Sequence, residues 1–98
     1  MAAIQIVRFK LASNVDANEF RALNERFQRE VAPKLPGLER REATVGEGGE
    51  WMLVLRYRDV ESAKKAGKSD TSDVSQKFIT MIDMKTMSAS FHEIVSEG

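Results

Sequence analysis

The chain has 98 residues, equal numbers of basic and acidic side chains (15 each, formal net charge zero), and no cysteine. This length fits a single domain, residues 1–98, and the balanced charge provides no overall field that would attract nucleic acid. The absence of cysteine excludes disulfides, zinc–thiolate sites and thiol nucleophiles.

Residues 4–11 are predicted to form the first strand, because β-branched and aromatic residues are concentrated there and the second half alternates. A helix is predicted to follow, with Asp16 as its N-cap and an end near Pro33. Apolar residues recur along this helix at the spacing of one buried face: Phe20, Leu23, Phe27 and Val31.

A β-hairpin is predicted next, with strands at residues 38–45 and 51–58 joined by a glycine-rich turn. Asp59 is expected to cap a second helix in two pieces, because residues 67–73 favour turns and caps. The helical stripe is expected to resume with Val74, Phe78, Met81 and Ile82. Residues 87–94 alternate and are predicted to form the last strand.

The order βαββαβ predicts an α+β fold of the ferredoxin-like type, with a four-stranded antiparallel sheet and both helices on one face. The strand residues expected to face the helices are Val7, Phe9, Leu53, Leu55 and Phe91. The residues expected on the other face are Ile4, Ile6, Arg8, Met52, Val54, Arg56, Ser90, His92 and Ile94. Because this second face is too apolar to remain in water, we expect a homodimer that packs one sheet against another.

Four segments resemble the antibiotic biosynthesis monooxygenase group of dimeric α/β barrels: residues 8–11, 35–38, 51–57 and 59–63. The resemblance extends from residue 4 to about residue 91, and it implies the fold of a dimeric α/β barrel. The group includes cofactor-independent oxygenases acting on quinols or polycyclic aromatics, haem-degrading enzymes, and proteins without known activity. Tyr57 stands where the group often has a tryptophan, and Ala66 and Gly67 stand where it often has a histidine.

Two residues are candidates for a catalytic role as proton acceptor, Tyr57 and His92. His92 is the only histidine, and imidazole titrates near neutral pH, although a lone histidine is more often structural. Trp51 shares a strand face with Tyr57, so the two could frame an aromatic ligand or belong to the core. A single histidine and no cysteine give few strong ligands, so no metal site is predicted.

Three further residues are candidates for substrate binding. The guanidinium groups of Arg8 and Arg56 could bind a carboxylate or phenolate, or they could pair with Glu42. Asn14 could reach the mouth of a cavity between sheet and helices, or it could form the turn before the first helix.

The sequence thus predicts a small homodimer that resembles cofactor-independent monooxygenases, with an aromatic or quinol-type ligand and no cofactor. The alternatives are a ligand-binding or structural dimer without catalysis, and a small isomerase or lyase in which His92 moves a proton. Neither a signal sequence nor a long apolar run is present, so we expect a cytoplasmic protein with no membrane partner.

Overall fold

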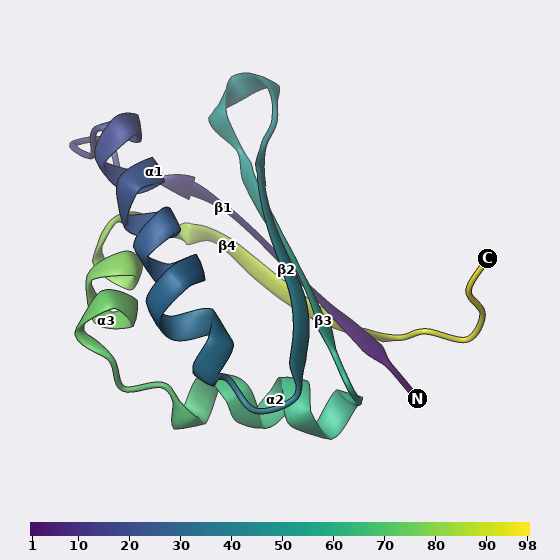
Figure 1. Cartoon of the computed structure of the whole chain (residues 1–98). Coiled ribbons are helices and arrows are strands. Elements are labelled where there is room, and N and C mark those ends of the chain that lie inside the picture. Colours follow the sequence, from purple (N-terminus) through teal and green to yellow (C-terminus); the bar gives the residue numbers. More distant parts are fainter.

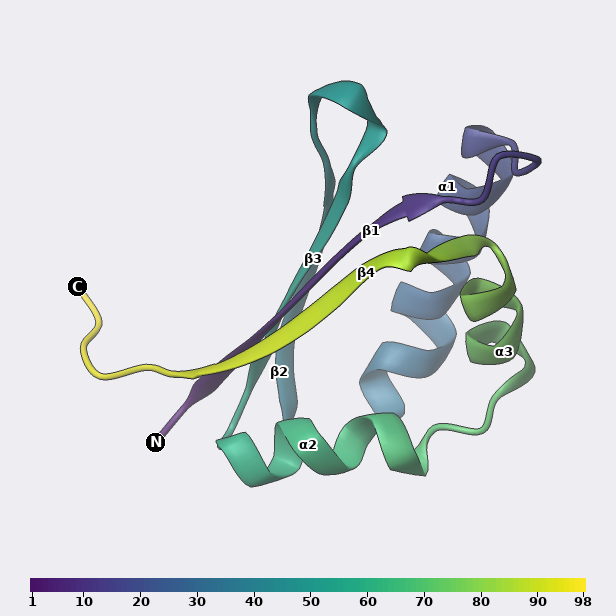
Figure 2. The same ribbon diagram turned by 180° about the vertical axis from the view of Figure 1, so that it is seen from behind.

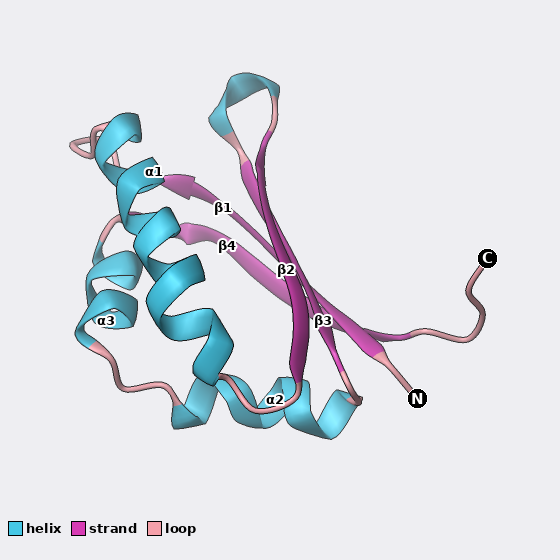
Figure 3. Cartoon of the chain, viewed as in Figure 1, coloured by secondary structure: helices cyan, strands magenta, loops and turns pink.

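The computed structural model describes the backbone of residues 1–98 and all side chains except those at positions 67 and 69. Four strands and three α-helices follow one another along this described chain (Figures 1 and 3). They are β1 (Ala3–Leu11), α1 (Ala17–Arg26), β2 (Leu38–Val45), β3 (Trp51–Tyr57), α2 (Val60–Ser69), α3 (Asp73–Thr80) and β4 (Ile82–Glu93). None of the described helices is long and apolar enough to cross a membrane.

The four strands form one antiparallel sheet in the order β2-β3-β1-β4. All three helices lie on one side of it, as the views from front and back show (Figures 1 and 2). The predicted ferredoxin-like α+β fold is therefore confirmed. We call the side covered by helices the helix face of the sheet and the other side the open face.

The strand registers confirm most of the predicted division between the two faces. Val7 pairs with Leu53 on the helix face, and Ile6 pairs with Val54 on the open face. Phe91 pairs with Gln5 and so belongs to the helix face, as predicted. Its side chain is nevertheless 39% exposed, because β4 is an edge strand.

The first helix begins where the sequence places it, with Asp16 accepting a hydrogen bond from the Asn18 amide at 2.7 Å. It does not continue as a regular α-helix to Pro33. A π-helical turn, Phe27–Val31, follows α1, and a 3₁₀ turn, Ala32–Lys34, follows that. Phe20, Leu23 and Val31 are buried as predicted, whereas Phe27 at the start of the π turn is only partly buried.

The second helical region is in two pieces, as predicted, but the break is shorter than the expected 67–73. Asp59 caps α2 by accepting from the Ser62 amide at 2.7 Å, and the helix continues to its end at Ser69. Ser72 then caps α3 by accepting from the Ser75 amide at 3.2 Å. The short break suffices because Ser72 both ends the turn and starts the next helix.

The last strand is longer than predicted, since β4 begins at Ile82 and not at residue 87. Ile82 is therefore a strand residue, and the expected helical stripe ends with Phe78 inside α3. Ile82 is buried, and a buried apolar residue is expected here whether the segment is a helix or a strand. The apolar pattern alone therefore could not distinguish the two at this point.

The core is built around a cluster of four aromatic rings on the helix face. Phe20 of α1 lies 4.8 Å from Trp51 and 4.7 Å from Phe78, measured between ring centroids, and 5.7 Å from Phe9. Phe9 and Phe20 are fully buried. This cluster fixes α1 and α3 against β1 and β3, and it fills one end of the space between helices and sheet.

Candidate functional site

At the other end of that space the side chains leave a cavity of about 200 Å³ on the helix face. Its floor is the sheet, and its walls come from the end of the first helix, from α2 and α3, and from the start of β4. Most of its lining is aliphatic or aromatic: Val7, Phe9, Phe27, Leu35, Leu53, Leu55, Tyr57, Ala66, Phe78, Ile79, Ile82 and Met87. The polar lining residues are Gln5, Arg41, Asp70 and Ser75.

Tyr57, the last residue of β3, lines this cavity. It is 2% exposed, and burial raises the pKa of its phenol, an effect that Arg41 partly offsets. The phenol therefore stays protonated at neutral pH. This state suits a hydrogen-bond donor better than the proton acceptor that the sequence suggested.

Arg41 of β2 lines the cavity and was not among the site residues predicted from the sequence. It is 7% exposed, and its Nη1 and Nη2 donate to the amide oxygens of Gln28 (3.0 Å) and Asn24 (2.8 Å). Its guanidinium carbon lies 4.6 Å from the ring centroid of Phe27 and 6.0 Å from that of Phe78. None of the ion pairs among the described side chains includes Arg41.

A signal for Arg41 exists in the sequence. Arg41, Ala43 and Val45 alternate along the second strand, and the register places Arg41 opposite Leu55 on the helix face. The alternation is hidden because the register shifts between Leu38 and Arg40. Even-numbered Leu38 therefore lies on the helix face at one end of the strand, whereas odd-numbered residues lie on that face after the shift. The run of four charged residues at 39–42 is therefore typical of a strand that is exposed to solvent on both faces.

Asp70 and Ser75 also line the cavity, at the break between α2 and α3. The Ser75 hydroxyl and the Ser72 amide both donate to the Asp70 carboxylate. Burial acts to raise the pKa of Asp70, but the hydrogen bonds from Ser75 and Ser72 outweigh it, and the pKa lies below its ordinary value. Asp70 is therefore ionised at neutral pH.

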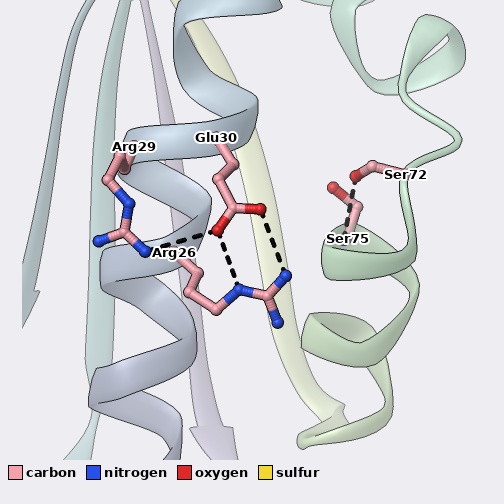
Figure 4. Close-up of polar contacts among 5 residues, drawn as sticks. All are labelled: Arg26, Arg29, Glu30, Ser72 and Ser75. Atoms are coloured by element: carbon pink, nitrogen blue, oxygen red, sulfur yellow. Dashed lines mark hydrogen bonds and ion pairs between the residues drawn. The ribbon is translucent and has the colours of Figure 1, made fainter.

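Figure 4 shows the surroundings of this region, with the cap between Ser72 and Ser75 at the start of α3. Across from it, Arg26 donates to Glu30 from Nε at 3.0 Å and from Nη2 at 3.3 Å, joining α1 to the π turn. Both side chains are largely exposed, so this pair contributes little stability.

The structure places two predicted site residues away from the cavity lining. Trp51 lies on the same face of β3 as Tyr57 but at the other end of the strand, where it is 5% exposed and packed against Phe20. Asn14 is exposed in the turn between β1 and α1. Neither belongs to the residues that line the cavity.

The remaining predicted site residues, Arg8, Arg56 and His92, lie on the open face. His92 Nε2 is 2.8 Å from the Ser90 hydroxyl, and both border a hollow of about 280 Å³ together with Arg8. The sheet itself separates His92 from Tyr57, so the structure does not bring the two proposed catalytic residues together.

Arg56 pairs with acids, but not with the one predicted. Its Nε lies 3.3 Å from a Glu39 carboxylate oxygen, and its Nη2 contacts Glu97. The expected partner Glu42 pairs with Arg40 instead. Hydrogen bonding to Glu97 is the main reason that the pKa of Arg56 is raised.

Among the described residues, no three His, Asp or Glu side chains gather as metal ligands would. The polar groups of the cavity are one buried cation, one phenol, one carboxylate, a hydroxyl and an amide. Such a set can orient an oxygen-bearing aromatic molecule and stabilise a negative charge on it.

No protein-family model matches the sequence, and no curated protein matches it either. The structure is similar to SnoaB, a cofactor-independent oxygenase from Streptomyces nogalater, with TM-score 0.77, 11% identity, and coverage of 98% of this chain and 95% of that one. It is also similar to a putative antibiotic biosynthesis monooxygenase from Chloroflexus aurantiacus (TM-score 0.70, 12% identity, coverage 100% and 98%). A dimeric protein of unknown function with a ferredoxin-like fold from Bacteroides fragilis matches with TM-score 0.65, 15% identity, and coverage of 95% and 96%.

At these identities the similarity establishes the fold. The resemblance to antibiotic biosynthesis monooxygenases, which the sequence indicated, is confirmed at that level.

Proposed function

We propose that the protein is a homodimeric, cofactor-independent oxygenase that acts on a small electron-rich aromatic molecule bound in the cavity on the helix face. The observation that carries this proposal is the cavity itself, a largely apolar space with Tyr57 in its wall. A dry apolar cavity of ~150 Å³ binds benzene in another protein, so the space here suits a substituted ring. The fold shared with SnoaB supports the same reaction class.

The reaction can be written with a simple hydroxyarene. One 1-naphthol and one O₂ give one 1,4-naphthoquinone and one water: the ring carbon opposite the hydroxyl loses its hydrogen and gains an oxygen atom. The arene is oxidised, and the second oxygen atom is reduced to water. The hydroxyl proton leaves first, and in this scheme the ionised carboxylate of Asp70, which lines the cavity, accepts it. The electron-rich anion that remains supplies the electrons, so the scheme includes no cofactor.

The dimer in this proposal forms through the open face. Ile6, Met52 and Val54 are only partly buried there, and β4 leaves Met84 54% exposed on an edge strand. A long exposed edge of this kind is normally paired or covered in native proteins. A second copy of the chain covers both features, and two structures of this fold are described as dimeric.

The test is oxygen consumption by the purified protein with 1-naphthol, in the presence of a metal chelator. We expect consumption above the rate without protein, formation of 1,4-naphthoquinone, and at least a tenfold loss of rate in Tyr57→Phe. Lys64→Met, an exposed change on α2, serves as the control and should keep the rate. Failure of the parent protein to accelerate oxygen uptake with 1-naphthol or with larger quinols would refute the proposal.

The second candidate function is a ligand-binding dimer without catalysis. It is favoured by the lowered pKa of Asp70. Its carboxylate is already hydrogen-bonded by Ser75 and Ser72, which makes it a weak base. Binding of 1-naphthol without turnover would favour this second function. An isomerase or lyase that uses His92 receives no support from the cavity, since His92 lies on the open face.

A further inference from the structure

Arg41 has no assigned role in the proposed oxygenase reaction, and its buried charge needs an explanation. A guanidinium carries a permanent positive charge, and burial of a charge is unfavourable unless an opposite charge or several hydrogen bonds compensate it. Only 7% of the surface of Arg41 is exposed. Its guanidinium donates to the side chains of Asn24 and Gln28, and both are neutral amides.

The hydrogen-bonding capacity of Arg41 is also not used up. A guanidinium has five N–H donors, and the two bonds to Asn24 and Gln28 use one donor each. The Nε–H is buried and has no acceptor in the described part of the chain. A buried donor without a partner is uncommon in native proteins and is a sign of a missing ligand or water.

The groups around Arg41 fix its position. Asn24 on α1 and Gln28 on the π turn are four residues apart, about one helical turn. Their amide oxygens each accept a hydrogen bond from one terminal nitrogen of Arg41, which fixes the orientation of the guanidinium. The rings of Phe27 and Phe78 face the guanidinium. Single π turns inside helices occur frequently at functional sites, and this one carries two of the four contacts to Arg41.

We propose that the ligand of this cavity is an aromatic acid, a planar ring bearing one ionised oxygen group that is bound by Arg41. This inference rests on the proposed function in one respect, that the cavity on the helix face is the ligand site. The ligand supplies the missing negative charge and an acceptor for the unpartnered Nε–H of Arg41, while its ring occupies the apolar part of the cavity. A carboxylate and a phenolate meet the same chemistry, and both are planar oxygen anions that a guanidinium recognises.

Other charges near the cavity restrict the ligand further. Asp70 is a second charged lining residue, and its negative charge disfavours a ligand with two anionic groups. Tyr57 is protonated and can donate one hydrogen bond to the ligand. The lining of the cavity therefore fits best a largely apolar ligand that carries a single negative charge.

Calorimetric titration of the dimeric protein with two acids and their neutral amides tests this inference. The probes are benzoate against benzamide and 2-naphthoate against 2-naphthamide, so that each pair keeps the ring and its planar substituent and replaces one carboxylate oxygen by an uncharged NH2 group. We expect at least one acid to bind ten times more tightly than its amide. In Arg41→Met the acid should lose this advantage while the amide still binds.

Arg29→Met is the matched control. Arg29 follows Gln28 on the same π turn, but its side chain is 68% exposed, so its removal should leave the preference for the acid unchanged. If Arg41→Met does not fold, Arg41→Lys keeps the charge without the fork of donors, and it should retain part of the preference. The comparison in the parent protein needs no variant.

The possible failures are distinct. Equal binding of acid and amide by the parent protein would overturn the aromatic-acid inference and leave the oxygenase proposal standing. A preference for the acid that survives Arg41→Met would overturn the assignment to Arg41. Oxygen consumption with 1-naphthol decides the proposed reaction separately, and failure of all four probes to bind would remove the cavity as a ligand site.

Discussion

Replacement of Phe20 by alanine should be among the most destabilising single changes in this protein. Transfer of a phenylalanine ring from water to the core is worth roughly 1.5 to 3 kcal/mol, and the cavity left behind raises the cost of Phe→Ala to about 3–5 kcal/mol. Phe20 is 0% exposed and contacts the rings of Phe9, Trp51 and Phe78. These rigid rings cannot move far enough to fill the space that the Phe20 ring leaves. We therefore expect a loss at the upper end, about 4 to 5 kcal/mol.

Urea unfolding followed by tryptophan fluorescence measures this loss directly. Trp51 is the only tryptophan, and its ring centroid lies 4.8 Å from that of Phe20. With a urea slope of about 1 to 3 kcal/mol per molar, the midpoint should fall by roughly 1.3 to 5 M. Phe91→Ala is the control, because Phe91 is 39% exposed on the edge strand and should cost about 1 kcal/mol or less. Equal shifts for the two alanine variants would refute the assignment of the core.

Three further results are expected. Tyr57 is the only tyrosine, so an absorbance titration reports its pKa alone: it should lie above 10.0, and Arg41→Met should raise it further because a nearby positive charge is lost. Because the pKa of Asp70 is lowered by folding, its carboxylate stabilises the folded protein above about pH 4, and this contribution is lost as the pH falls through the folded-state pKa. Asp70→Asn should therefore lower the stability at neutral pH and make it fall less steeply in acid. Thermal melts across the acid range measure both effects. Val54→Asp places a charge on the open face and should convert a dimer to a monomer in light scattering at micromolar concentration; a monomeric parent protein would contradict the proposed dimer.

The fold was predictable because its signals are local and agree with one another. Asp16 and Asp59 both cap helices where the sequence places them, and the apolar alternation of β3 gives the two faces of a central strand. The length of β4 was not predictable in the same way. Ile82 is apolar and follows a helical stripe, and only pairing with Leu11 of β1 shows that it belongs to a strand.

The candidate site was predictable only in part. Tyr57 was found because it ends an apolar strand beside a helix cap, and both of those features are visible in the sequence. Arg41 and Asp70 were missed because each lies within a polar stretch, and their burial depends on a strand register shift and on the packing of the break between α2 and α3. His92 was proposed as a proton acceptor for its chemistry, although the alternation of the last strand had already placed it on the face opposite Tyr57, and the register confirms that face.

The most direct test of the account is the position of a bound aromatic acid. A crystal of the protein soaked with 4-bromobenzoate can locate the bromine by its anomalous scattering. The account predicts the ring in the helix-face cavity near Phe27 and Phe78, with the carboxylate within hydrogen-bond distance of Arg41. An ordered ligand on the open face beside Arg8 and His92, with the cavity at Arg41 left empty, would contradict it.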